Sequence, residues 1–188
     1  SYNANDAIRS YFDAVSAFSI NDGDAKGLRE IGFGAVSSFM EDGIARGTSV
    51  VATLGNTSDN EVILKDKAAA YYSFNKGSSK QNFPVSLMGS VALLRQTYMD
   101  AAWYKDAKPF TDLALDSWLA QQSLPQIIEG NDKLSVLLAD NIGDEFGVQY
   151  IIKGGGDEYQ RINEIKATKA SLIIPVNFPK AYDVDDPI

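Results

Sequence analysis

The second half of the chain contains three short runs of β-branched apolar residues, and they constrain the fold more than any other feature of the sequence. The runs PQIIE, VQYIIK and SLIIPV begin at even spacing, at Pro125, Val148 and Ser171. Short, continuous apolar runs are typical of strands buried on both faces of a parallel sheet. The sequence therefore predicts three neighbouring parallel strands in this half.

The segments between these runs have helical patterns. In the first, one apolar residue recurs every four positions along a helical stripe: Leu134, Leu138, Ile142 and Phe146. Asn131 or Asp132 is the expected N-cap, and Gly147 is the expected stop. The second segment, GDEYQRINEIKATKA, begins with acids and ends with lysines, as a helix dipole favours. The predicted order is β-α-β-α-β, which occurs in open doubly wound sheets and in closed (β/α)8 barrels.

Polar residues stand at the carboxyl end of each predicted strand, where both fold classes gather their binding groups. These residues are Glu129, Lys153 and Asn177. Glu129 suits either a helix-terminus partner or a binding residue, and the residues alone favour neither. Lys153, at the end of the adjacent strand, would neutralise Glu129 at partly buried range. We expect Glu129, Lys153 and Asn177 to make any ligand contact that the chain retains.

The first half of the chain is less regular. We expect a helix over residues 4–15 and a short helix before Glu30. Two strands, FGAVSSFME and GTSVVATLG, should follow, separated by the turn-prone segment DGIARG. The polar region from Asn56 to Asn82 contains the apolar segment AAAYYSF, and we interpret it as a helix with an excursion loop.

Two helices are predicted before the first strand of the second half. One runs from Pro84 to Ala107, and the other starts near the cap Thr111 and ends near Gln122. We therefore expect a single domain over residues 1–188, with an irregular α/β part at 1–83 and a regular part at 84–188.

The composition excludes several kinds of chemistry. The 188 residues include no histidine and no cysteine, which rules out disulfides, thiolate catalysis, Ser-His dyads and His-ligated metal sites built from this chain alone. A net charge of −8 without a basic cluster argues against nucleic acid and anionic membranes as partners. The apolar runs are shorter than the roughly 20 residues that span a bilayer. We expect a soluble, globular chain.

Three short motifs have a functional and a structural interpretation. The triglycine Gly154–Gly156 could bind an anion, but Asp157 and Glu158 stand where a phosphate would lie, so a structural turn is favoured. Ser73 to Lys76 matches S-x-x-K and Ser58 to Asn60 matches S-D-N, in the reverse of the order found in penicillin-binding proteins; coincidence is favoured.

The third motif is a set of adjacent aromatic residues: Tyr71, Tyr72, Trp103 and Tyr104. Rings that stack on a sugar would be exposed, whereas rings of an amphipathic core would be buried. General burial tendencies favour the core.

The order LPQIIEGNDK, LADNIGDEFGVQYIIKGGGDEYQRINEIKATKASLIIPVNFPK resembles the second half of a metal-dependent amidohydrolase barrel of the imidazolonepropionase-like branch. In that branch a strand ending in His-Ala precedes a helix ending EFG, and a strand ending in His-Gly precedes a helix bearing a Tyr. The segment IGFGAVSSFMEDGIARGTSVVATLG similarly resembles the family's G-V-T-T-V strand and hairpin. The resemblance covers most of the chain except residues 56–82. It implies a partial (β/α)8, TIM-like barrel.

The resemblance also places Glu129 at a strand-end position that holds a metal-binding histidine in active members, and Gly154 at the next such position. The family's His-x-His pair would lie before Ser1, and its strand-eight aspartate after Ile188. Glu129 is then a candidate metal ligand, but a divalent ion such as zinc would need ligands from outside this segment. No catalytic residue is expected within it.

Two functions follow from this reasoning. The first is a fragment of an imidazolonepropionase-like hydrolase of C–N bonds that is not catalytic alone. The alternative is a non-enzymatic, degenerate barrel that serves as a ligand-binding or scaffold module. The resemblance suggests a longer, secreted or periplasmic bacterial protein, whose remainder would be the main partner. Unpaired strands at the edge of a partial barrel also favour self-association of the fragment.

Overall fold

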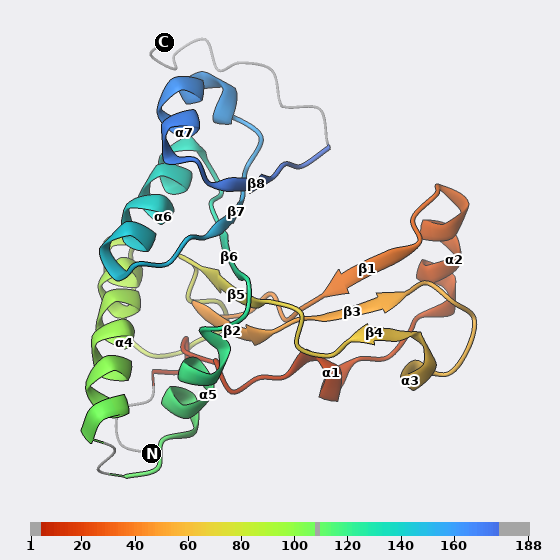
Figure 1. The fold of residues 1–188 in the computed structure, drawn as a ribbon, viewed down its shortest axis with the longest axis horizontal. Helices are drawn as coiled ribbons and strands as arrows, with labels where there is room; N and C mark the ends of the chain where they lie inside the picture. The colour runs from red at the N-terminus through yellow and green to blue at the C-terminus, as the bar shows by residue number, and fades with distance from the viewer. Residues whose placement is uncertain (1–4, 108–109, 177–188) are drawn as a thin grey trace. The chain divides into compact units, whose positions relative to one another are not determined.

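The computed structural model describes residues 5–107 and 110–176, and these form a mixed α/β fold (Figure 1). The chain divides into two compact units, one up to Pro125 and the other from Gln126 onward. We call them unit 1 and unit 2. No helix in the described ranges is both long and apolar enough to cross a membrane.

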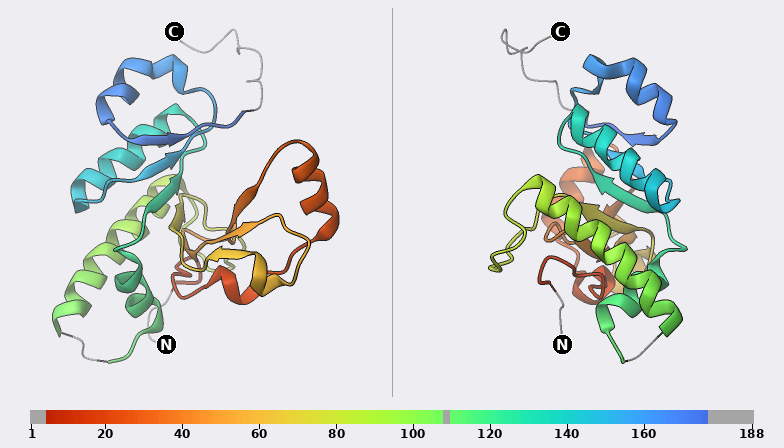
Figure 2. Two further views of the ribbon diagram at one scale, coloured as in Figure 1. Left: turned by 45° about the vertical axis from the view of Figure 1, so that its right-hand side comes forward. Right: turned by 90° about the vertical axis from the view of Figure 1, so that its left-hand side faces the viewer.

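Unit 2 has the predicted β-α-β-α-β order. Its strands are β6 (Gln126–Glu129), β7 (Ile151–Lys153) and β8 (Ser171–Ile173), which pair in parallel in that order. Its helices are α6 (Lys133–Phe146), the 3-10 turn η1 (Glu158–Arg161) and α7 (Ile162–Thr168). Figures 1 and 2 show α6 and α7 on the same side of the three strands, as crossovers of one hand require.

The ends of α6 match the sequence signals. Asp132 is the N-cap, and its Oδ1 accepts hydrogen bonds from the backbone N–H groups of Leu134 and Ser135, at 2.8 and 2.9 Å. Gly147 follows the last turn with a left-handed φ of 68°, which a glycine adopts without strain.

The predicted apolar stripe of α6 is confirmed at Ile142, wrong at Leu134, and only half-buried at Leu138 and Phe146. The helix buries Val136, Ala139 and Ile142, whereas Leu134 is 60% exposed. The close approach of Gly143 to the backbone of Val148 brings the small-residue face of the helix against the following segment.

Strand burial decreases across the sheet of unit 2. Residues 126–128 are buried, as predicted for a strand covered on both faces, but the residues of β8 are partly or largely exposed. Within the described residues, β8 pairs with β7 on one side only. It therefore lacks the burial that its apolar sequence predicted.

Unit 1 contains the remaining elements: α1 (Ala14–Ala17), α2 (Asp22–Glu30), β1 (Ala35–Ser38), β2 (Ala45–Thr48), β3 (Val50–Thr53), α3 (Asp59–Val62), β4 (Ile63–Lys65), β5 (Ala70–Ser73), α4 (Leu87–Ala107) and α5 (Leu113–Gln121). Strand β3 pairs antiparallel with β1 and β4, and β2 pairs antiparallel with β5. The fully buried Trp118 packs edge-on against Tyr72 and Tyr98. The sequence located α2 correctly, and α4 ends at the expected Ala107 but begins three residues after Pro84, at Leu87. Helix α5 begins one residue later than expected because Asp112 is its N-cap.

Two predictions for the first half are wrong because tertiary pairing overrides local propensity. Residues 4–15 were expected to form a helix, but Ile8 and Asp13 instead make parallel bridges to Ala45 and Thr48. The segment DGIARG was expected to be a turn, yet it contains the start of the buried strand β2.

The segment AAAYYSF was also expected to be helical, and it forms the buried strand β5. All four residues of β5 are buried, so its side chains are covered on both faces of the strand. A continuous apolar run of this length suits a buried strand as well as a helix, and only the pairing with β2 distinguishes the two.

Candidate functional site

Glu129 and Lys153 lie side by side at the carboxyl ends of β6 and β7. The two residues are register partners in the parallel sheet, and Lys153 Nζ lies 2.7 Å from Glu129 Oε1. The side chain of Glu129 is 19% exposed and that of Lys153 is 38% exposed, so the ion pair is only partly screened by water. The expected neutralisation of Glu129 by Lys153 is confirmed, and Asn177 lies outside the described residues.

The triglycine that follows β7 is held close to the backbone of the preceding crossover. Gly154 N donates to Ile173 O at 3.0 Å, which extends the pairing toward β8. A Cβ on Gly155 would overlap the carbonyl oxygen of Asn131. Gly156 has a φ of 103°, which residues with a side chain rarely adopt. Close packing therefore explains the glycine at position 155, and the backbone conformation explains the glycine at position 156.

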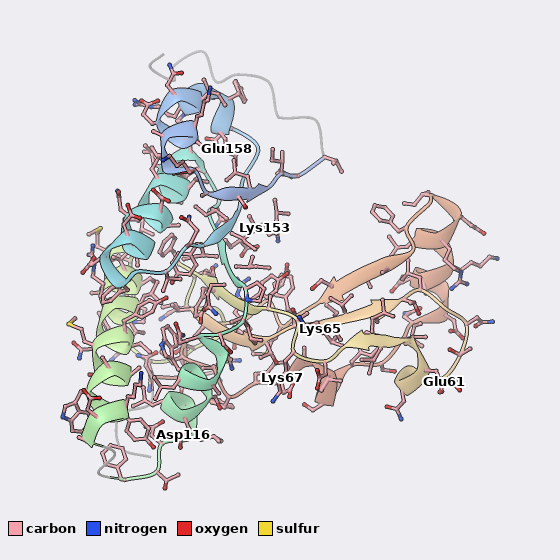
Figure 3. All side chains as sticks on the ribbon, viewed as in Figure 1. Glu61, Lys65, Lys67, Asp116, Lys153 and Glu158 are labelled. Carbon is pink, nitrogen blue, oxygen red and sulfur yellow. The ribbon has the colours of Figure 1, made fainter. Side chains whose placement is uncertain are left out.

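The carboxylate of Glu158 fills the space beside this turn. The side chain is nearly fully buried, and both oxygens accept from Gly156 N at 3.0 and 3.1 Å. A Cβ on Gly154 would overlap Glu158 Oε1. The anion that the glycine turn holds is therefore the protein's own side chain, which agrees with the structural interpretation of the motif. Figure 3 labels Lys153 and Glu158 in unit 2.

Lys133, the first residue of α6, connects that helix to η1. Its ammonium donates to Gln160 Oε1 and lies 3.9 Å from Asp157 Oδ2. Beside it, burial raises the pKa of Asp132, but the hydrogen bonds from Ser135 and Leu134 outweigh burial, so the pKa of Asp132 is lower than usual. We call Glu129, Lys153, Gly154–Gly156 and Glu158 together the strand-end site.

The strand-end site does not fit a catalytic zinc ion. Such a site needs several N, O or S ligands around one open coordination position. Glu129 is bound by a lysine, and the space at Gly154 is filled by a second carboxylate. Among the residues that the structure describes, no group of three or more His, Cys, Asp or Glu side chains could hold a metal ion.

The two serine motifs have structural roles. Ser73 Oγ accepts from Asn75 N at 3.0 Å, while Lys76 Nζ donates to Gln81 O at 2.9 Å, so the lysine does not activate the serine. Ser58 is the N-cap of α3 and forms a capping box with Glu61.

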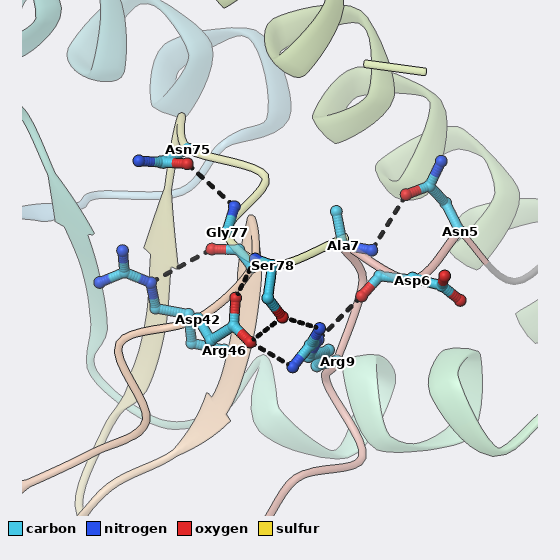
Figure 4. A network of polar contacts seen from close by, with 10 residues as sticks. Asn5, Asp6, Ala7, Arg9, Asp42, Arg46, Asn75, Gly77 and Ser78 are labelled. Atoms are coloured by element: carbon cyan, nitrogen blue, oxygen red, sulfur yellow. Dashed lines mark hydrogen bonds and ion pairs between the residues drawn. The ribbon is translucent and has the colours of Figure 1, made fainter. Parts of the chain in front are cut away.

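A polar network in unit 1 surrounds Asp42 (Figure 4). Asp42 Oδ2 lies 2.5 Å from Arg9 Nη1 and accepts from Ser78 Oγ at 2.6 Å, and Oδ1 accepts from Ser78 N at 2.7 Å. The hydrogen bonds from the side chain and backbone of Ser78 hold the pKa of Asp42 below its usual value. Both carboxylate oxygens are occupied by partners within the chain, so the network ties three segments of unit 1 together.

Sequence reasoning missed Lys133 as a partner of Asp157 and of Gln160. The signal for Glu158 was present, because an acid two residues after a glycine turn can fold back onto its N–H groups. For Lys133 no local signal existed, since its partners lie 24 and 27 residues further along the chain.

Comparison with known proteins supports the fold. No protein-family model matches the chain, and no curated protein matches it. A crystal structure of an amidohydrolase from Thermotoga maritima MSB8 matches with a TM-score of 0.76 and 18% identity, covering 90% of this chain and 49% of that one. The chain spans about half the length of that amidohydrolase. At this identity the likeness shows an amidohydrolase-like fold alone, and the described strands do not form a closed barrel.

Proposed function

We propose that the chain is a non-catalytic part of an imidazolonepropionase-like amidohydrolase, a partial (β/α)8 barrel that serves as a scaffold within a longer hydrolase of C–N bonds. The likeness in fold supports the relation to amidohydrolases. The absence of histidine and cysteine supports a non-catalytic role for this segment. Its partner is then the remainder of the parent chain, in a secreted or periplasmic bacterial protein.

The observation that carries the proposal is that the strand-end site is occupied by the chain's own charges. Lys153 supplies the positive charge beside Glu129, at 2.7 Å. An ammonium group neutralises a carboxylate but offers no exchangeable coordination position at which water could be activated. Glu158 fills the second position and is itself bound by Gly156 N. The site is therefore arranged for stability.

Metal content tests this proposal. The full 188-residue chain is incubated with zinc, passed through a desalting column and measured by elemental analysis, beside the variants Glu129→Gln and Lys153→Met. We expect no stoichiometric zinc in the unchanged chain or in Glu129→Gln, because Glu129 is committed to Lys153. One zinc per chain that is lost in Glu129→Gln would overturn the proposal and make Glu129 a ligand.

The variant Lys153→Met adds a second criterion. It removes the ammonium while keeping most of the apolar stem, and it leaves Glu129 partly buried without this partner. Because the pair is only partly buried, we expect a loss of about 1 kcal/mol in the free energy of unfolding. Unchanged stability would contradict a structural role for the pair.

A further inference from the structure

Unit 1 contains a pocket beside α4. We call it the α4–α5 pocket. Its volume is about 240 Å³. It is lined by residues from the N-terminal segment, from α4, from the segment that leads into α5 and from the first turn of α5: Asn5, Ile8, Leu93, Thr97, Asp100, Trp103, Phe110, Asp112, Ala114 and Leu115. The strand-end site contributes none of these residues.

Two half-exposed aromatic rings stand in the wall of this pocket. Trp103 is 54% exposed and Phe110 is 49% exposed, and their ring centroids lie 6.4 Å apart. Tyr104, the sequence neighbour of Trp103, is fully buried and packs against Phe110 at 6.0 Å. The four adjacent aromatic residues therefore have two different environments. Tyr71, Tyr72 and Tyr104 are in the core, as burial tendencies favoured, whereas Trp103 is at the pocket.

Carboxylates supply the charge of the pocket. Asp100 and Asp112 line it, and Asp6 lines an adjoining cavity of about 310 Å³ that shares Asn5, Ile8, Asp112 and Ala114 with it. Among the residues that the structure describes, no lysine or arginine lines either cavity. Asp100 accepts from the neutral Gln96 Nε2 at 2.6 Å, and Asp112 Oδ1 caps α5. Within residues 5–107 and 110–176, no cationic side chain forms an ion pair with the carboxylate of Asp6, Asp100 or Asp112. Arg9 Nε donates to the backbone oxygen of Asp6 at 2.8 Å.

We propose that the α4–α5 pocket binds a small organic cation, a free molecule that carries a guanidinium or ammonium group. Exposed aromatic faces attract such groups, and nearby carboxylates neutralise them. The net charge of −8 would further concentrate cations near the chain. The volume lies just below the range of about 300–1,000 Å³ for drug-sized ligands, which suits a small molecule.

A neutral sugar fits the same pocket less well. It would stack on Trp103 and bond to Asp100, but it would leave the negative charge of the acids uncompensated. A cation satisfies the aromatic rings and the carboxylates together. This inference goes beyond the proposed scaffold function and does not depend on it.

A matched pair of probes tests the charge requirement on the full chain. Pentylguanidinium and pentylurea have nearly the same shape, but only the first is charged. Of the two tryptophans, Trp103 lines the pocket and Trp118 is 1% exposed, so a ligand should change the emission of Trp103. We expect a saturable change with pentylguanidinium that weakens as salt rises, and no saturable change with pentylurea.

Two charge variants of α4 localise the site. Asp100→Asn keeps the shape of the pocket, and we expect the affinity for pentylguanidinium to fall about five- to tenfold. Asp106→Asn removes the same charge from an exposed position of the same helix that does not line the pocket, and it should change the affinity less than about twofold. Calorimetry measures both, and Trp103→Phe should abolish the optical response.

Three results would overturn the proposal. The first is a response to pentylurea equal to that to pentylguanidinium. The second is an equal loss of affinity in Asp100→Asn and Asp106→Asn, which would show that the overall negative charge of the chain, and not the pocket, attracts the cation. The third is the absence of saturation with pentylguanidinium up to about 10 mM, which corresponds to negligible affinity. Circular dichroism spectra identical to that of the unchanged chain would show that the variants fold.

Discussion

The hydrogen bonds inside unit 1 and those inside unit 2 join residues at different separations along the chain. In unit 2, the polar contacts Lys153 to Glu129 and Lys133 to Gln160 join residues 24 and 27 positions apart, about one βα repeat. In unit 1, Ser10 Oγ donates to Ala114 O at 2.5 Å across 104 positions, and Gln121 Nε2 donates to Ser10 O across 111. Unit 2 is thus built from neighbouring repeats, whereas unit 1 must bring its first and last segments together.

This difference shows where each unit is sensitive to mutation. The segment before α1 in unit 1 lies against β2 without being a strand of its own, so it depends on close backbone approach and on single hydrogen bonds. Unit 2 depends on helix caps and on the pairing of short strands. Both tryptophans belong to unit 1, so fluorescence follows that unit, while circular dichroism follows the helices of both.

The largest effect is expected from Gly47→Ala in unit 1. Gly47 has a φ of 77°, and a Cβ there would overlap the carbonyl oxygen of Phe12, which is backbone and cannot move aside easily. We expect a loss of about 3 kcal/mol or more in the free energy of unfolding, measured by urea titration with tryptophan fluorescence. Gly27→Ala is the control, because nothing lies within 4 Å of its added Cβ, and it should stabilise α2 by up to about 1 kcal/mol. Equal urea transitions for Gly47→Ala and Gly27→Ala would contradict the close approach of Gly47 to the carbonyl oxygen of Phe12.

An intermediate effect is expected from Ser10→Ala. The variant leaves the buried carbonyl of Ala114 without its hydrogen bond from Ser10 Oγ, so the free energy of unfolding should fall by about 1–3 kcal/mol. Ser16→Ala removes a local, exposed bond to Asp13 O and should change it by less than about 0.5 kcal/mol. If Ser10→Ala and Ser16→Ala had the same free energy of unfolding, the long-range hydrogen bond of Ser10 would contribute no more than a local one. The contrast between unit 1 and unit 2 would then be lost.

The smallest effect is expected from Asp132→Ala in unit 2. Loss of this N-cap should lower the free energy of unfolding by about 1 kcal/mol at pH 7, measured by circular dichroism in urea. The folded pKa of Asp132 is lowered, so its contribution is complete above the unfolded pKa of about 3.9 and is lost as the pH falls through the folded value.

The cap variant also tests whether the units respond separately. The difference between Asp132→Ala and the unchanged chain should shrink at low pH, whereas Asp132→Asn should keep the cap and lose the pH dependence. The fluorescence transition of unit 1 should not move. A shift of equal size in the fluorescence and circular dichroism transitions would show that both units unfold in one cooperative step. The stability of one unit could then not be compared with that of the other.

Much of unit 2 could be predicted because its signals are local. The three apolar runs, the Asp132 cap and the Gly147 stop lie within or beside the elements that they specify. The pairing of Glu129 with Lys153 followed from parallel strand order alone. The buried stripe of α6 was predicted correctly at Ile142 but not at Leu134, because Leu134 and Val136 are both apolar and only packing decides which of them faces inward.

The sequence by itself determined that the second unit is β-α-β-α-β, that α4 is a long helix, and that no histidine or cysteine is available for catalysis. Only the tertiary structure decided that β2 and β5 are buried strands, that Glu158 fills the space beside Gly154, and that Trp103 borders a pocket while Tyr104 does not. Helix caps and hydrophobic periods act between near neighbours, so they can be recognised along the chain. Burial and close backbone approach depend on residues that are distant in sequence, and they are decided only when those residues meet.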